Sequence, residues 1–240
     1  MVKDKIIVAL DVPTKEEALA IVAELGDKVG AYKIGMQLYN ACGPEILKEV
    51  TARNGKIFLD LKFHDIPNTV ASAAKVVADL GVFMFNVHAC GGSKMMKAAA
   101  EALKEEAANL GVARPLLIAV TVLTSLSEEE VQGEIGISRS IEEQVAAMAK
   151  LAQDCGLDGV VASPKEIAII REACGEDFLI VTPGIRPRDA SVDDQKRVKT
   201  PGEAVKDGAD YLVIGRPITK AEDRVAAVNS IVADMESALQ

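Results

Sequence analysis

The chain has 240 residues, of which 49% are hydrophobic, 26% are charged and only 3% are aromatic, with no tryptophan. This composition is close to that of average globular domains and excludes a disordered or fibrous chain, while the length suits a single α/β barrel domain. The formal net charge of −9 argues against nucleic acid and anionic membranes as partners, because both are bound by clustered lysine and arginine. One small phosphorylated ligand, held by a few local cations, remains compatible with this charge.

The sequence predicts neither a membrane segment nor a metal site. No apolar run approaches the length of about 18 residues that a transmembrane helix needs, and the N-terminal MVKDKIIVALDVP enters a strand without a long apolar leader. The histidines His64 and His88 and the four cysteines show no zinc-ligand spacing. We therefore expect a cytoplasmic protein with buried free thiols and no bound metal.

Short apolar runs rich in β-branched residues alternate with longer, alanine-rich helical segments along the whole chain. The expected strands are Ile6–Asp11, Tyr32–Met36, Ile57–Lys62, Met84–His88, Leu116–Val122, Gly159–Ser163, Leu179–Thr182 and Tyr211–Gly215. Expected helices between them include Lys15–Leu25, Val70–Leu80, Ser93–Leu110, Ser140–Cys155 and Ala221–Leu239. Near-continuous hydrophobic strands are typical of parallel sheets covered on both faces.

Eight strand–helix units in a chain of this length predict a single-domain (β/α)8 TIM barrel over residues 1–240. The alternative is a doubly wound open sheet, which would usually carry a glycine-rich turn after its first strand. Here the first strand ends in Asp11-Val12-Pro13 instead. The sequence shows no linker and no second domain.

In such a barrel the active site lies at the C-terminal ends of the strands, and charged side chains gather there. Asp60 and Lys62 are two residues apart on the third strand and should face the same side. Lys33, on the neighbouring second strand, should lie beside Asp60, and Asp65 follows in the next loop. We therefore expect an alternating array of Lys33, Asp60, Lys62 and Asp65.

This array has two interpretations. It is either a structural ion network that closes the mouth of the barrel or a catalytic group. Carboxylates on both sides would favour the charged form of Lys62, which suits a proton donor and not a Schiff-base nucleophile.

A second group of residues follows the seventh and eighth strands, where barrels of this kind commonly bind phosphate. Pro183-Gly184-Ile185-Arg186 and Ile214-Gly215-Arg216 combine glycines, which let backbone N–H groups approach an anion, with arginines that bind phosphate in a bidentate manner. The alternative is turn glycines with surface arginines. The charged stretch between Arg186 and Thr200 contains Gln195 and is interpreted as a lid, while His88, Asn86 and Cys90 are interpreted as structural.

Several of these segments resemble a known family. The motifs ALDVP, YKIG, DLKFHDIPNT, HACGG, AVTVLTS, TPGIRP and IGRPIT, which extend from Asp11 to about Thr219, are similar to those of the orotidine 5'-phosphate decarboxylase family in bacteria. DLKFHDIPNT is the most specific of them, because D-x-K-x-x-D alone is shared with sister enzymes. Cys90 departs from the pattern, which has a small residue such as alanine or serine at this position.

The resemblance implies cofactor-free decarboxylation of orotidine 5'-phosphate to uridine 5'-phosphate, the last step of pyrimidine synthesis. It assigns proton donation at C6 to Lys62 and places Lys33 and Asp60 in the charge network around that lysine. Asp65 and Thr69 would reach the site of the second subunit of a homodimer. The implied substrate contacts are Asp11 at the ribose, Ser163 at the pyrimidine, Thr124 after the fifth strand, and Arg186, Gln195, Gly215 and Arg216 at the phosphate.

Two alternatives stay open at this point. A magnesium-dependent decarboxylase or aldolase of sugar phosphates shares the D-x-K-x-x-D strand, but it carries a metal-binding glutamate where this chain has Lys33. A catalytically inactive barrel could instead bind nucleotides as a sensor. The complete set of acids and lysines at the rim argues against the sensor.

Overall fold

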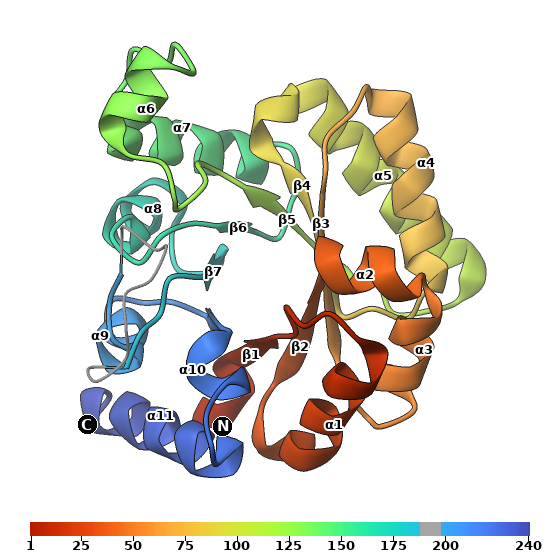
Figure 1. The fold of residues 1–240 in the computed structure, drawn as a ribbon. Helices are drawn as coiled ribbons and strands as arrows, with labels where there is room; N and C mark the ends of the chain where they lie inside the picture. Colours follow the sequence, from red (N-terminus) through yellow and green to blue (C-terminus); the bar gives the residue numbers. More distant parts are fainter. Residues whose placement is uncertain (188–197) are drawn as a thin grey trace.

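Eight parallel strands close into a barrel in the computed structural model, which describes residues 1–187 and 198–240 (Figure 1). Each strand pairs with the next along the chain, and the last pairs with the first. The strands are β1 (Ile6–Ala9), β2 (Ala31–Gly35), β3 (Ile57–Phe63), β4 (Met84–His88), β5 (Leu116–Val120), β6 (Gly159–Val161), β7 (Leu179–Thr182) and β8 (Tyr211–Ile214). The predicted TIM barrel is confirmed.

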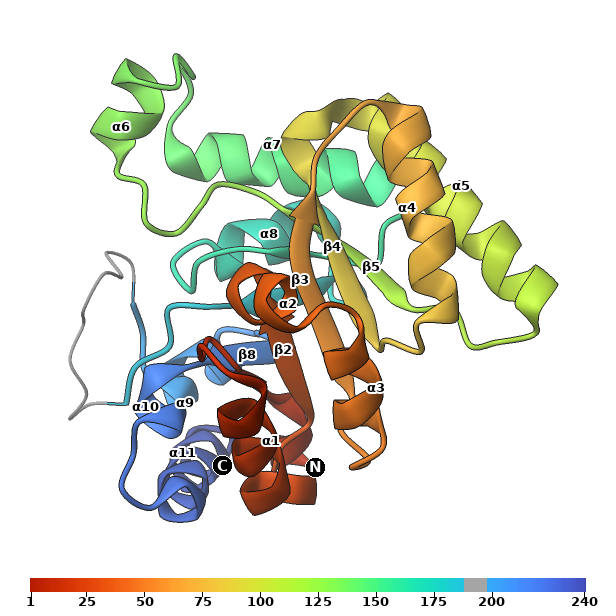
Figure 2. The same cartoon turned by 45° about the vertical axis from the view of Figure 1, so that its right-hand side comes forward.

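Helices surround the barrel in both views (Figures 1 and 2). They are α1 (Lys15–Leu25), α2 (Met36–Cys42), α3 (Glu45–Thr51), α4 (Pro67–Asp79), α5 (Gly92–Leu110), α6 (Glu128–Gly133), α7 (Ile141–Asp154), α8 (Ile167–Cys174), α9 (Pro201–Lys206), α10 (Arg216–Thr219) and α11 (Arg224–Ala238), with short 3-10 turns η1 (Val2–Lys5), η2 (Gly26–Lys28) and η3 (Ala89–Gly91). None of the helices in the described ranges is long and apolar enough to cross a bilayer.

The helices begin where local sequence satisfies their first N–H groups. Ser127, Ser140 and Thr200 each accept a hydrogen bond from the backbone N–H three residues ahead, and the glutamate at that third position returns the bond. This capping box stabilises a helix start by satisfying two donors at once.

Several predicted strands extend too far at their C-terminal ends. β1 ends at Ala9, β6 at Val161 and β8 at Ile214, so that Asp11, Ser163 and Gly215 follow their strands in loops. The ladder stops where the chain turns outward to its helix, and that turn is where the candidate site residues lie.

Two hydrophobic clusters separate the inside of the barrel from the layer beneath the helices. The larger cluster joins outward-facing strand residues such as Ile34, Leu59 and Phe85 to the helices. The smaller one fills the barrel with inward-facing residues, among them Ile7, Phe58 and Met84. Because the interior is packed in this way, the mouth above it has a closed hydrophobic floor.

At the N-terminal end of the barrel, an aspartate that binds both a backbone N–H of the preceding strand and an arginine occurs twice. Asp158, just before β6, accepts hydrogen bonds from Leu117 N–H on β5 at 2.7 Å and from the Arg114 guanidinium. Asp210, just before β8, does the same with Ile180 N–H on β7 at 2.8 Å and with Arg171. In each pair of strands, the carboxylate fixes the register of one strand against the other.

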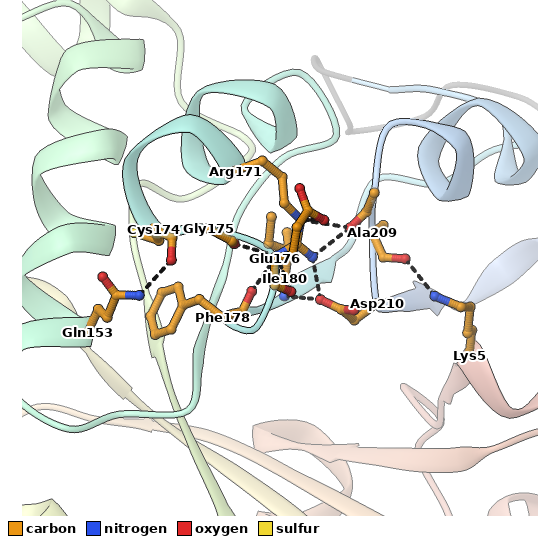
Figure 3. A network of polar contacts seen from close by, with 11 residues as sticks. Lys5, Gln153, Arg171, Cys174, Gly175, Glu176, Phe178, Ile180, Ala209 and Asp210 are labelled. Carbon is orange, nitrogen blue, oxygen red and sulfur yellow. Dashed lines mark hydrogen bonds and ion pairs between the residues drawn. The ribbon is translucent and has the colours of Figure 1, made fainter.

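Arg171 extends this second pair into a network (Figure 3). Its guanidinium, whose side chain is only 10% exposed, also donates to the carbonyl oxygens of Gly175, Glu176, Phe178 and Gly208. One arginine thus holds the end of α8, the start of β7 and the start of β8 together.

Arg171→Met should lower the free energy of unfolding by about 3 kcal/mol, because it leaves Asp210 and several carbonyl oxygens without their buried cation. Urea unfolding measures the change. Lys75→Met is the control, since the Lys75–Glu105 pair is 44% and 64% exposed and should contribute less than about 1 kcal/mol. Equal effects of the two substitutions would contradict the role given to Arg171.

Candidate active site

A cavity of about 620 Å³ opens at the C-terminal ends of the strands. This volume lies within the range of about 300–1,000 Å³ that is typical of small-molecule sites. Eight of the residues predicted for the site line it: Asp11, Lys33, Asp60, Lys62, Thr124, Arg186, Gly215 and Arg216. The rim of the barrel is therefore a single site to which β1, β2, β3, β5, β7 and β8 or the loops after them contribute.

One side of the cavity holds an ion network around Asp60. Lys33 Nζ lies 3.2 Å from one carboxylate oxygen of Asp60 and 2.9 Å from Asp11 Oδ1. Lys62 Nζ lies 2.6 Å from the other carboxylate oxygen of Asp60. The predicted contacts of Asp60 with both lysines are thus confirmed.

The network shifts the pKa values of its buried members. Burial would raise the pKa of Asp60, but the ammonium groups of Lys33 and Lys62 outweigh it and lower that pKa below its ordinary value. Burial would lower the pKa of Lys33, but the Asp60 and Asp11 carboxylates more than offset this and raise it. The network therefore keeps both groups charged at neutral pH.

The ion pair between Lys33 and Asp11 was not predicted from the sequence, and Gly35 leaves room for it. A Cβ atom at this position would lie 3.0 Å from Lys33 Nζ and 3.2 Å from Asp11 Oδ1. The glycine of the YKIG segment is thus explained by space beside the ion pair.

Strand β3 is irregular where it carries the site. Leu59 pairs with Phe85 and Phe63 with Val87, so three residues of β3 face the single residue Asn86 of β4. Lys62 has a φ of +54°, a left-handed conformation that is uncommon for a residue other than glycine. The contact between Lys62 and Asp60 thus depends on a bulge, and not on the regular strand alternation that the sequence analysis assumed.

The structure corrects the prediction for Asp65, the fourth member of the expected array. Asp65 is exposed, its carboxylate accepts the Ile66 N–H at 2.6 Å, and no ion pair within the described ranges joins it to Lys62. The chain turns away after the bulge to begin α4 at Pro67, which carries Asp65 and also the exposed Thr69 off the cavity wall. Within one chain the array therefore has three members plus Asp11.

The part of the cavity wall formed by the loops after β7 and β8 carries the residues predicted to bind phosphate. Gly184 has a φ of +77°, and Arg186 is only 8% exposed, with its guanidinium donating to the Ile185 carbonyl oxygen. Gly215 directly precedes α10, which begins at Arg216. Gln195 lies outside the described residues, as does most of the predicted lid.

Ser163 does not line the cavity. It is fully buried, its N–H donates to the Glu166 carboxylate at 2.8 Å, and its hydroxyl accepts the Lys165 N–H at 3.3 Å. The structure explains this serine by the turn it stabilises after β6, and its predicted contact with a pyrimidine stays a prediction.

Two of the residues that were interpreted as structural, His88 and Cys90, contact His64. His88 has a lowered pKa because of its burial and its neighbours His64 and Lys62, and its ring lies 5.4 Å from that of His64. Cys90 is exposed, not buried, with its sulfur 3.9 Å from His64 Nε2. Across the parts of the chain that the structure describes, no group of three or more histidine, cysteine, aspartate or glutamate side chains could hold a metal ion.

The cavity also has polar lining residues that were not predicted from the sequence, among them Glu17, Thr219 and Lys220. Thr219 lies inside the IGRPIT motif, three residues after Arg216, and this position was the available signal. Glu17 lies on α1 and Lys220 directly follows α10, and only the closed barrel brings them to the mouth.

The pKa directions give a pH-dependent prediction. The pKa of Asp60 is lowered by folding, so its stabilising effect is complete above the unfolded pKa of about 3.9 and is lost as pH falls through the folded pKa. The pKa of Lys33 is raised by folding, so its stabilising effect is complete below the unfolded pKa of about 10.4 and is lost as pH rises through the folded pKa. Lys33→Met should therefore lower the free energy of unfolding at pH 7 by about 3 kcal/mol. The deficit should shrink below about pH 4, because Asp60 in the variant has lost the cation that lowers its pKa most and takes up a proton at a higher pH than in the wild type.

Urea unfolding at a series of pH values checks this. Lys15→Met, which breaks the partly exposed Lys15–Glu49 pair, is the control for losing a lysine. A deficit for Lys33→Met that stays constant between pH 7 and pH 3 would refute the coupling to Asp60.

Comparison with known proteins shows the family of the chain. Residues 4–231 match the family described as "Orotidine 5'-phosphate decarboxylase / HUMPS family". A relative from Moorella thermoacetica named orotidine 5'-phosphate decarboxylase is 56% identical over 234 residues, which cover 98% of this chain and 93% of the relative. One of the same name from Syntrophomonas wolfei is 53% identical over 235 residues and 98% of both chains.

Solved structures give the same result. A crystal structure named orotidine 5'-phosphate decarboxylase from Lactobacillus acidophilus has a TM-score of 0.84 and 42% identity, covering 96% of this chain and 98% of that one. An uncharacterized conserved protein from Geobacillus kaustophilus has the same TM-score with 41% identity, covering 96% and 99%. The chain therefore belongs to the orotidine 5'-phosphate decarboxylase / HUMPS family.

Proposed function

We propose that this protein decarboxylates orotidine 5'-phosphate to uridine 5'-phosphate in pyrimidine synthesis, without a cofactor, and that Lys62 protonates C6 of the ring. The observation that carries the proposal is the position of Lys62, which lines the cavity and is held 2.6 Å from the buried Asp60 carboxylate. Relatives that are more than half identical over nearly the whole chain carry the name of this activity.

The chemistry requires a fixed cation. Loss of CO₂ from C6 leaves an electron pair on a ring carbon that has no adjacent electron sink. A preorganised positive charge in a water-poor site stabilises such a carbanion as it forms. The ammonium group of Lys62 would supply this charge and then transfer its proton to C6, so that uridine 5'-phosphate leaves and the lysine regains a proton from solvent.

The cavity has two chemically distinct sides, and they suit the two ends of this substrate. Asp11, Lys33, Asp60 and Lys62 lie at the ends of β1 to β3, where the ring and ribose would bind. Arg186, Gly215 and Arg216 follow β7 and β8 and would bind the phosphate, together with Gln195. Binding energy from the phosphate could then be used to hold the reacting ring in place.

The magnesium-dependent alternative fits the residues less well. Lys33 Nζ lies between the Asp11 and Asp60 carboxylates, at 2.9 and 3.2 Å. A divalent cation would have to displace this ammonium group, and it would lose the carboxylate that the sister enzymes have at this position.

The test is an absorbance assay of orotidine 5'-phosphate loss with and without EDTA. The wild type should turn over equally in both. Lys62→Ala should lose at least about 10³-fold in kcat, because both the cation and the proton donor are removed, while uridine 5'-phosphate should still bind. Turnover of Lys62→Ala within tenfold of wild type would refute the proton-donor role, and a loss of activity in EDTA would favour the magnesium enzyme.

We further propose a homodimer in which Asp65 and Thr69 complete the site of the other subunit. Both residues are exposed and lie off the cavity of their own chain. Ile66 and Val76 near them are apolar and 67% and 63% exposed, which suits a surface covered by a second copy.

Subunit mixing tests this arrangement. Inactive Lys62→Ala and inactive Asp65→Ala proteins are mixed under conditions that exchange subunits. Random pairing makes about half of the dimers mixed, and each mixed dimer would hold one site with both residues intact, so about a quarter of wild-type activity should return. No recovery, with mixed dimers confirmed by mass spectrometry, would show that Asp65 does not act in the partner's site.

A further inference from the structure

We propose that Asn86 is a positioning residue for the decarboxylation: its side-chain amide holds both the backbone of Lys62 and the carboxylate of Asp60 in their working geometry. This inference rests on the proposed function, because it assigns to Asn86 the placement of the proposed proton donor.

The contacts of Asn86 connect the two residues directly. Its amide oxygen accepts the backbone N–H of Lys62 at 2.8 Å. Its amide nitrogen donates to Asp60 Oδ1 at 2.7 Å, which is the same oxygen that pairs with Lys62 Nζ. The Asn86 side chain thus contacts both the backbone of Lys62 and the carboxylate that binds the ammonium group of Lys62.

The backbone contact replaces a missing strand bond. Asn86 lies on β4 opposite the three-residue bulge of β3, where regular pairing between the strands is interrupted. The Lys62 N–H would otherwise lack a β4 carbonyl partner. Because a buried N–H without a partner is costly, the asparagine oxygen makes the bulge stable.

The bulge is under backbone strain. A residue with a side chain in the left-handed region costs roughly 1–2 kcal/mol relative to ordinary conformations, and Lys62 is held there with φ at +54°. Such a conformation persists only where its surroundings determine it. Without the Asn86 bond, Lys62 would be free to relax towards regular strand geometry, which would move its ammonium group relative to the cavity.

Asparagine suits this place for a specific reason. The site needs an acceptor for an N–H and, next to it, a donor for a carboxylate, and a primary amide offers both with fixed geometry. Asn86 is 1% exposed and does not line the cavity, so it would act through Lys62 and Asp60, and not by touching the substrate.

The experiment compares Asn86→Ala with the wild type by steady-state kinetics on orotidine 5'-phosphate. We expect kcat to fall about 10²-fold, the loss that a displacement of about 1 Å in a reacting group can cause. KM should change by less than about threefold, because the phosphate-binding side is untouched. Arg171→Met is the matched control: it removes buried hydrogen bonds at the other end of the barrel, so it should lower stability but leave kcat per folded site unchanged.

Asn86→Asp provides a second and independent readout. It keeps the shape and the acceptor for Lys62 N–H but places a second carboxylate beside Asp60 Oδ1. Two adjacent carboxylates share a proton and one titrates at higher pH, so the acid limb of the kcat profile should move to higher pH. Arg171→Met should show no such movement.

The outcomes separate this inference from the function on which it rests. If Lys62→Ala is inactive while Asn86→Ala keeps kcat within threefold of wild type, the positioning role is refuted and the proton donor stands. An equal kcat loss in Arg171→Met also refutes it, since that loss would reflect stability alone. If Asn86→Ala does not fold, Asn86→Asp decides: an unshifted profile with wild-type kcat overturns the proposal. Turnover retained by Lys62→Ala overturns the proposed function instead.

Discussion

The buried carboxylate of Asp60 is the constraint on which the rest of the site depends. A single ionised carboxylate in the mouth of a hydrophobic barrel would be strongly unfavourable, yet Asp60 is 7% exposed and stays charged. It does so because Lys33 binds one oxygen and Lys62 and Asn86 bind the other. Lys33 lies on β2, Lys62 on β3 and Asn86 on β4, so the charge of Asp60 is stable only in the closed barrel.

This arrangement links the fold to the chemistry through geometry. Parallel strands in register bring Lys33 and Asp60 to the same end of the barrel, since Gly35 pairs with Asp60 and Lys33 with Phe58. The bulge in β3 then turns Lys62 back onto Asp60. Groups fixed on strands and supported by a second layer of contacts hold their positions better than groups on loops.

Sequence reasoning predicted this site unevenly, for physical reasons. The neighbour relation of β2 and β3 follows from barrel topology, and it correctly predicted that Lys33 contacts Asp60. The bulge could not be predicted, because Lys62 is not a glycine and nothing in its type signals a positive φ. Asn86 was interpreted as structural for the same reason: its role depends on the bulge opposite it. Asp65 was placed in the array by spacing alone, and the turn into α4 moved it out.

The charges of the cavity also constrain how an anionic substrate could bind. Asp11, Lys33, Asp60 and Lys62 carry two negative and two positive charges, so this side is balanced as a group. In a protein of net charge −9, a balanced group offers little long-range attraction to a substrate that bears both a phosphate and a carboxylate. Attraction must then come from lining cations outside this group, such as Arg186 and Arg216. In the proposed function, the phosphate bound at these arginines supplies the binding energy. The carboxylate of the substrate ring would then lie near the Asp60 carboxylate, so that binding favours the state in which CO₂ has left.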